Sequence, residues 1–234
     1  EEERSEIENG SFYFVPLHYK NHNLGYVAAT YDNFGHYGDF MQPWAMNFAV
    51  AYENYFLHER LNAMNDIKRM YKEDTLTGIS NRRGFEEKAR KVYGDAAYLR
   101  KRVAVISIDM DNLKKVNDVY GHSAGDDALR RIARAMSDVA GCRDNIAYAR
   151  TGGDEFVIVC RIERPNEGAE LVTELREALG RINEQSEQAY CAEISCGLYE
   201  VKDSSKVALV KALEMSDKRM YEDKRERKLQ QQNK

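Results

Sequence analysis

The sequence predicts an α+β fold, and three observations support this. Residues 102–108 form an almost unbroken apolar run, which is typical of a buried strand. Residues 146–162 read as two strands around a glycine-containing turn, which indicates an antiparallel hairpin. Segments with helical periodicity lie between these strands and after them. Helices combined with an antiparallel hairpin in one sheet define the α+β class.

The first 43 residues have a different pattern. Residues 12–19 and 24–31 read as two strands around a turn at 20–23. Because an isolated hairpin is marginal in water, we expect this pair to complete a larger sheet. The segment resembles the closing strands of a GAF-type sensor domain. A plain N-terminal hairpin packed on its neighbour is the equal alternative.

A long helix follows. No glycine or proline occurs between Pro43 and Tyr71, and apolar side chains recur at helical spacing. The recurring positions are Trp44, Phe48, Ala51, Tyr55, Leu57, Leu61, Met64, Ile67 and Tyr71. Two interpretations stay open: the apolar seam pairs with a second copy in a two-helix coiled coil, or it packs on its own domain.

The remainder alternates between helices and strands. The pattern predicts helices at 83–93, 112–120, 125–140, 166–185 and 205–226, strands at 102–109 and 189–199, and the hairpin at 146–162. We expect the tail at 230–234 to be frayed.

Composition excludes several classes of function. A chain of 234 residues suggests one or two domains, and its net charge of −4 provides no basic surface for nucleic acid. No apolar run approaches the roughly 20 residues that span a bilayer, and no signal-peptide pattern is present. We therefore expect a cytoplasmic protein. Because the chain starts at Glu1 without Met, we expect it to be a fragment of a longer protein. A membrane-linked protein is compatible with this expectation.

The four cysteines show no Cys-x-x-Cys spacing. We expect Cys142, Cys160, Cys191 and Cys196 to be buried, reduced thiols, and not a disulfide or metal site.

Carboxylates gather at two strand ends. Gly152, Gly153, Asp154 and Glu155 form the tip of the hairpin, where adjacent acids repel each other unless positive charge lies between them. Glycines let a large ligand approach the backbone closely. Asp109 follows the buried strand directly, which suits the second half of a carboxylate pair for a divalent metal that holds a phosphate.

Four separated motifs agree with one family. They are Asp74-Thr-Leu-Thr-Gly-Ile-Ser-Asn-Arg-Arg83, the block from Asp109 to Asp126, the segment from Gly152 to Phe156, and Asp217-Lys-Arg-Met-Tyr221-Glu-Asp-Lys224. On these motifs, roughly residues 72–228 resemble the GGDEF domain of diguanylate cyclases. The expected domains are a sensor-like segment at 1–43, a dimerisation helix at 44–73, the catalytic domain at 74–228 and a tail at 229–234.

The resemblance implies a fold similar to the palm of nucleotidyl cyclases and polymerases. It implies an enzyme that condenses two GTP molecules into cyclic di-GMP and needs Mg²⁺ or Mn²⁺. The implied metal ligands are Asp109, the Met110 carbonyl and Asp154, with Glu155 supporting a second metal. Asp154 is also the candidate general base, and Glu155 and Lys114 complete the implied catalytic set.

The resemblance also implies a substrate-binding set. Asn117 and Asp126 match a guanine-reading pair, in which a carboxylate accepts from the N1–H and N2–H donors of guanine. An N-cap role for Asp126 is the alternative, and both roles are compatible. Lys114, Lys224 and Lys228 match phosphate-contacting lysines, although helix lysines are commonly solvated. We expect His122 to lie near substrate, and Gly152 and Gly153 to face the ribose and phosphates.

Because the family acts as dimers, the resemblance favours a homodimer through the helix at 44–71. Two other functions remain open: a non-catalytic module that binds GTP or cyclic di-GMP, and a mainly structural dimerisation module. Family members often carry Arg-x-x-Asp before the hairpin, where product inhibits. Here Arg143 is followed by Ile146 at the acid's position, so we expect weak product inhibition. Leu113 replaces a common Phe, which is a mild apolar change.

Overall fold

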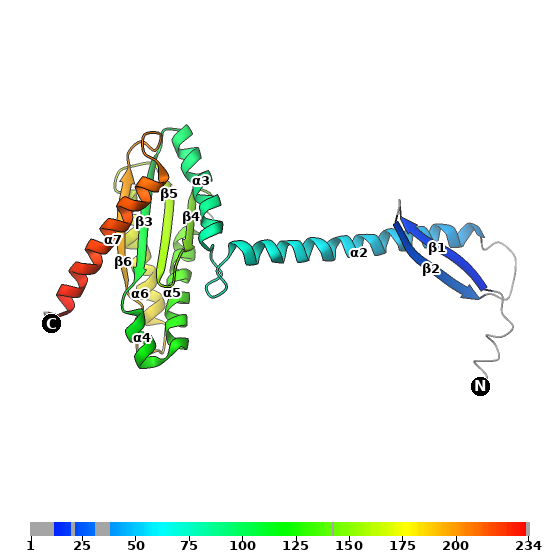
Figure 1. The fold of residues 1–234 in the computed structure, drawn as a ribbon, viewed down its shortest axis with the longest axis horizontal. Helices are drawn as coiled ribbons and strands as arrows, with labels where there is room; N and C mark the ends of the chain where they lie inside the picture. Colours follow the sequence, from blue (N-terminus) through cyan, green and yellow to red (C-terminus); the bar gives the residue numbers. More distant parts are fainter. Residues whose placement is uncertain (1–11, 20–21, 31–37, 142, 233–234) are drawn as a thin grey trace. The chain divides into compact units, whose positions relative to one another are not determined.

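The computed structural model describes residues 12–19, 22–30, 38–141 and 143–232 (Figure 1). The chain divides into two compact units, residues 1–67 and 68–234, which we treat separately. No helix among the described residues combines the length and apolar character that crossing a membrane requires.

The first unit contains a hairpin and most of one long helix. Strands β1 (Phe12–Tyr19) and β2 (His22–Thr30) pair antiparallel. The second strand thus begins and ends slightly earlier than the predicted 24–31. Within the described residues these two strands form a sheet of their own, without the larger sheet that we expected.

Helix α2 (Gly38–Lys72) begins before the predicted residue 44 and contains Pro43 inside it. Proline is usually found in the first turn of a helix, because it has no N–H to donate to a carbonyl of the preceding turn. The helix accommodates Pro43 near its start. Trp44, Phe48, Tyr52 and Phe56, each one turn apart, form a run of ring contacts with centroids 4.7–6.3 Å apart.

The second unit is a four-stranded antiparallel sheet with helices on both faces. The strands are β3 (Arg102–Met110), β4 (Ile146–Arg150), β5 (Glu155–Ile162) and β6 (Ile194–Val201), in the order β4-β5-β3-β6. The predicted α+β class is confirmed. The helices are α3 (Arg82–Tyr98), α4 (Leu113–Tyr120), α5 (His122–Ala140), α6 (Glu167–Glu184) and α7 (Leu209–Gln232).

Two apolar layers explain why the central strand is continuously hydrophobic. Alternate residues of a strand face opposite sides of the sheet. Ile106 and Ile108 of β3 join the core beneath α5 and α6, whereas Val103 and Val105 join the core beneath α3 and α7. Figure 1 shows these helix pairs on opposite faces. Both faces of β3 are therefore covered, and its end is held in place from two sides.

Several predicted boundaries shift for local reasons. Helix α5 begins at His122 instead of residue 125, because Gly121, at a φ of 88°, lets the chain turn directly from α4 into α5. Helix α7 begins at Leu209 instead of 205, since Asp203 accepts from the Ser205 N–H and hydroxyl and closes a turn there. Strand β6 begins at Ile194 instead of 189, because the Asn183 side chain bonds both the N–H and the carbonyl of Ala192.

Helix α3 runs on to Tyr98, beyond the predicted residue 93. Helix α7 continues through Gln232, so most of the tail that we expected to be frayed is helical.

The cysteines agree only in part with the expectation of buried thiols. Cys160 and Cys196 are buried and free, and burial raises the pKa of Cys160 to about 11 and that of Cys196 to about 12. Cys191 is exposed instead of buried, because it lies in the irregular segment before β6. Cys142 lies outside the described residues.

Candidate functional site

The turn between β4 and β5 carries Asp154 beside the end of β3. The Thr151 N–H donates to the Glu155 carbonyl at 2.9 Å, which closes the turn. The Met110 N–H then donates to the Asp154 carbonyl, also at 2.9 Å. This second bond joins the turn to the last residue of β3 and brings Asp154 next to Asp109, as the sequence predicted.

The two glycines of this turn are not required by the packing of the protein. A side chain added at Gly153 would meet nothing within 4 Å, and one at Gly152 would meet the movable end of the Glu155 side chain. Neither glycine has a positive φ. Their small size therefore leaves the outer surface of the turn open to close approach by a ligand.

Asp109 is buried at this edge of the sheet, with 6 % of its surface exposed. Burial raises its pKa, and the nearby charges of Asp154 and Asp111 add to the rise, whereas the ammonium of Lys224 opposes it. The Lys224 Nζ lies 2.5 Å from Asp109 Oδ1. Burial acts to lower the pKa of Lys224, but Asp109 and the neighbouring acids outweigh it and hold the pKa above its usual value.

These groups fit a divalent cation with hard oxygen ligands. Asp109 and Asp154 supply carboxylates, and the Met110 carbonyl, directly after Asp109 in the chain, supplies a further oxygen. Among the described residues, no group of three or more His, Cys, Asp or Glu side chains is arranged to hold a metal by itself. Mg²⁺ typically takes one or two carboxylates and completes its shell with water and substrate phosphate oxygens, so two carboxylates suit it.

A cavity of about 430 Å³ opens beside Asp154, at the end of β3. It is lined by the predicted residues Met110, Lys114, Asp154 and Lys224. Lys115 and Asp118, which the sequence did not single out, also line it, together with Asn112 and Leu113. The lysines come from α4 and α7, so two separate helices bring positive charge to this cavity.

The predicted guanine-reading residues lie where α4 meets α5. A Cβ at Gly125 would stand 2.0 Å from Asn117 Oδ1, so the Asn117 amide rests directly on the start of α5. Asp126 is the next residue along and is partly exposed. Because α5 begins at His122, Asp126 lies inside the helix and cannot be its N-cap, which removes that alternative. His122 is the first, exposed residue of α5 instead of a turn residue.

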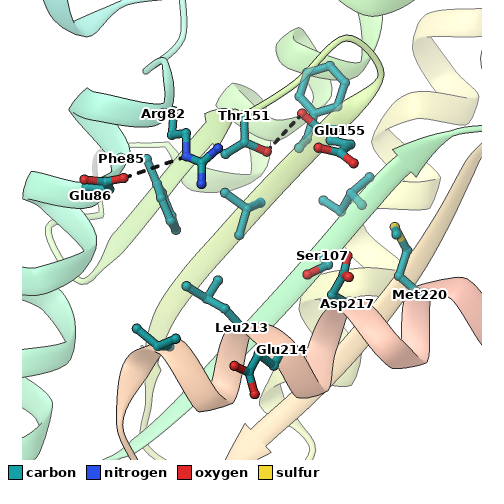
Figure 2. Close-up of a pocket in the computed structure, with 14 residues that line it drawn as sticks. Arg82, Phe85, Glu86, Ser107, Thr151, Glu155, Leu213, Glu214, Asp217 and Met220 are labelled. Atoms are coloured by element: carbon teal, nitrogen blue, oxygen red, sulfur yellow. Dashed lines mark hydrogen bonds and ion pairs between the residues drawn. The ribbon is translucent and has the colours of Figure 1, made fainter.

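Glu155 opens onto a different cavity from Asp154. This second cavity, of about 380 Å³, lies between α3 and α7, and Arg82, Thr151 and Asp217 also line it. Figure 2 shows Glu155 in this cavity. The Thr151 hydroxyl donates a hydrogen bond to the Glu155 carbonyl, and Arg82 forms an ion pair with Glu86. At the same time Glu155 is the cross-strand partner of Asp109. The two adjacent acids of the turn are thus divided between two cavities.

An ion pair ties the turn to the segment that follows α2. Asp74 accepts from Arg150 Nη1 at 3.0 and 3.2 Å, and Arg150 Nη2 donates to the Gly153 carbonyl at 2.7 Å. Asp74 opens the first of the quoted motifs and Arg150 lies in the predicted hairpin, but sequence reasoning gave neither residue a role. Their opposite charges in separate motifs were the signal that could have found the pair.

The remaining predicted residues are Lys228 and the pair Arg143 and Ile146. Lys228 lies on α7, but its side chain is not among those that the structure describes. Ile146 is buried in β4, while Arg143 is exposed and lies 3.8 Å from Glu174 of α6. The apolar Ile146 side chain therefore packs into the core and offers nothing to a guanine edge.

Comparison with known proteins agrees with this geometry. The family model described as "Diguanylate cyclase, GGDEF domain" matches residues 71–230. The chain is 30 % identical over 185 residues to the probable diguanylate cyclase DgcJ of Escherichia coli, which covers 77 % of this chain and 34 % of DgcJ. It is 31 % identical to the E. coli diguanylate cyclase DgcP over 65 % of this chain and 44 % of DgcP. The chain thus spans less than half the length of these relatives.

Solved structures share the fold. The coiled coil and GGDEF domain of DgcB from Caulobacter crescentus, in complex with c-di-GMP, aligns with a TM-score of 0.65 at 22 % identity, over 77 % of this chain and 95 % of that one. A sensory box/GGDEF family protein from the same organism aligns with a TM-score of 0.55 at 28 % identity, over 66 % of this chain and 99 % of that one.

Proposed function

Because this chain belongs to the GGDEF family of diguanylate cyclase domains, we propose that it condenses two GTP molecules into cyclic di-GMP and releases pyrophosphate. The observation that carries the proposal is a cavity lined by Asp154, Lys114 and Lys224, with Asp109 held beside it by its ion pair with Lys224. Carboxylates for a metal and lysines for a triphosphate are the groups that this reaction requires.

The proposed reaction assigns roles to these residues. The 3′-hydroxyl of one GTP attacks the α-phosphorus of the other, the hydroxyl proton passes to a base, and pyrophosphate leaves. The reciprocal attack by the second 3′-hydroxyl on the first α-phosphorus closes the ring and releases a second pyrophosphate. Asp154, at the tip of the turn, is the proposed base. Lys224 and Lys114 hold phosphate oxygens, and Lys228 extends this set along α7. Gly152 and Gly153 leave room for the ribose and phosphates.

Asp109, Asp154 and the Met110 carbonyl would hold Mg²⁺ or Mn²⁺, with Glu155 as the nearest additional acid. When bound, the metal supplies Lewis-acid stabilisation of phosphate charge and lowers the pKa of a coordinated hydroxyl. The pKa of Asp109 is raised first by burial, and the charges of Asp154 and Asp111 add to the rise.

Base selection is assigned to Asn117 and Asp126, with His122 near the substrate. A carboxylate accepts two hydrogen bonds from guanine, whereas adenine presents an acceptor at N1. An unpaired buried polar group costs about 1–3 kcal/mol, so Asp126 should discriminate against ATP.

The proposed active form is a homodimer. One chain carries one set of these motifs, so joining two GTP molecules needs two domains face to face. The seam of α2 supports pairing, because Leu57, Leu61 and Met64 are 45–49 % exposed. The hairpin of β1 and β2 is proposed as the end of a GAF-like sensor, and the use of GTP places the reaction in the cytoplasm.

Incubation with GTP and Mg²⁺, followed by product mass spectrometry, tests the proposal. We expect cyclic di-GMP and pyrophosphate, no product from ATP, and no product when a chelator is added. Tight binding of GTP or cyclic di-GMP without turnover would instead identify a non-catalytic binding module.

A further inference from the structure

Helix α7 rests on the sheet through unusually close contacts. The Ser216 hydroxyl lies 2.7 Å from the Ser107 hydroxyl of β3, and both residues are buried. A Cβ at Gly197 of β6 would stand 2.0 Å from the Ser216 carbonyl oxygen and 2.1 Å from the Met220 nitrogen. The helix backbone therefore lies directly against β6, and its distance from the sheet is fixed.

The rotation of the same helix is fixed one turn later by Asp223. Its Oδ2 accepts from the Cys196 N–H of β6 at 2.9 Å, from Arg176 Nη2 of α6 at 3.2 Å, and from Arg227 Nε at 3.3 Å. One carboxylate thus joins α7 to a strand and to a neighbouring helix.

A second carboxylate continues this network toward the catalytic edge. Asp111 Oδ1 accepts from the Ser195 hydroxyl at 2.7 Å. Its Oδ2 is buried without a hydrogen bond among the described residues, and its ion-pair partner, Arg227 Nη1, lies 3.9 Å away. Arg227 therefore connects Asp223 with the residue that follows Met110.

Lys224 is the next residue after Asp223, and its position depends on this network. Successive residues of an α-helix are separated by about 100°. With Asp223 held against β6, Lys224 projects toward the end of β3, where its Nζ lies 2.5 Å from Asp109 Oδ1. A small rotation of α7 would move the end of this long side chain farther than it moves the helix backbone.

We propose that Asp223, held by Arg176, is a positioning residue that aims Lys224 at Asp109 and at the substrate phosphates. The inference rests on the proposed function of this site. Asp223 is 28 % exposed and Arg176 is 41 % exposed. Exposed ion pairs contribute only about 0–1 kcal/mol to stability, so the pair acts on the position of Lys224 more than on the stability of the fold.

Two charge-removing variants test the role without leaving the Cys196 N–H unpaired. Asp223→Asn keeps an acceptor oxygen for that N–H but weakens the attraction to both arginines, and Arg176→Gln removes the ion pair from the other side. Glu222→Gln is the matched control, since Glu222 is the adjacent, exposed acid of the same helix. The measurements are KM and kcat for GTP, calorimetric binding of a non-reactive GTP analogue with Mg²⁺, and thermal unfolding.

We expect both variants to weaken analogue binding and raise KM by roughly tenfold, the scale of a modest misplacement of a site group, with a smaller change in kcat. The unfolding midpoint should stay close to that of the parent, and Glu222→Gln should match the parent throughout. Parent-like KM and analogue binding in Asp223→Asn would overturn the proposal.

A double-mutant cycle with Lys224→Gln separates positioning from a general structural effect. If Asp223 acts through Lys224, then Asp223→Asn causes no further loss of analogue binding once Lys224 is replaced. Additive losses would overturn the proposal. If the parent binds the analogue but makes no cyclic di-GMP, the proposed function fails, and the binding cycle still decides the role of Asp223.

Discussion

Lys224 and Asp109 form an ion pair of 2.5 Å between the last helix and the central strand of the sheet, although 115 positions separate them in the chain. Lys224 also feels the charges of Asp154 and Asp111. Lys224 thus lies among three carboxylates at the edge where the nucleotide is proposed to bind, and two of them, Asp109 and Asp154, are the proposed metal ligands that the first prediction tests.

Asp109→Ala and Asp154→Ala should each reduce turnover by roughly a hundredfold or more, the scale seen when one charge-stabilising group is lost. Each removes a proposed metal ligand, and Asp109→Ala also removes the ion-pair partner of Lys224. The rate of cyclic di-GMP formation and circular dichroism are the measurements. Turnover above a few per cent of the parent, in a normally folded variant, would rule out the two-carboxylate mechanism.

Asp126→Ser should relax the choice of base toward ATP more than it changes the dependence on metal. The structure excludes a capping role, so the carboxylate is free to read the guanine edge. Competition between GTP and ATP is the measurement, and Asp138→Ser, at an exposed acid farther along α5, is the matched control. An unchanged base preference in Asp126→Ser would remove Asp126 from the recognition set.

Asp74→Asn should destabilise the protein by about 1–2 kcal/mol at neutral pH, because it breaks a largely buried hydrogen-bonded pair with Arg150. Burial acts to raise the pKa of Asp74, but hydrogen bonds from Thr77 and Arg150 outweigh it and hold the pKa below its usual value. The stabilisation is therefore complete above the unfolded pKa of about 3.9 and is lost as the pH falls through the lower folded pKa. Urea unfolding of parent and variant across this range should converge in acid; a constant difference would contradict the assignment.

Charged substitutions at Leu57, Leu61 and Met64 should break the proposed dimer. Pairing of the α2 helices raises the effective concentration of the two catalytic domains to roughly millimolar when the geometry permits. The specific activity of the triple variant should then rise steeply with protein concentration, whereas the parent shows a flatter dependence. A triple variant that remains dimeric in sedimentation and equally active when dilute would show that the seam packs within its own chain.

Cyclic di-GMP should inhibit this enzyme weakly. Ile146 is buried in β4 and provides no acceptor beside Arg143. Titration calorimetry with cyclic di-GMP is the measurement, and Ile146→Asp is an informative companion variant if it folds. Sub-micromolar binding that survives mutation of the active site would show that product uses another arrangement of residues.

Local patterns predicted the elements better than they predicted the contacts. The apolar run at β3 and the periodicity of α6 lie close to where the sequence placed them, because burial imposes those patterns directly. The start of α5 was missed, since Gly121 allows a tighter connection than the spacing suggested.

Contacts between distant residues need the tertiary fold. The pairing of Lys224 with Asp109 was implied only through the family resemblance, and the pair of Asp74 and Arg150 was missed. The separation of Asp154 from Glu155 into two cavities depends on where the turn ends and β5 begins, which composition and spacing do not specify.

Two hydrogen bonds close residues 150–155 into a short ring. The Arg150 guanidinium donates to the Gly153 carbonyl, and the Thr151 N–H donates to the Glu155 carbonyl. Asp74 holds that guanidinium from outside the ring. A free loop loses about 1–2 kcal/mol of conformational entropy per residue when it is ordered. Here this entropy is lost when the protein folds, so the turn is already ordered before a nucleotide binds. More of the energy of the nucleotide's contacts therefore contributes to affinity.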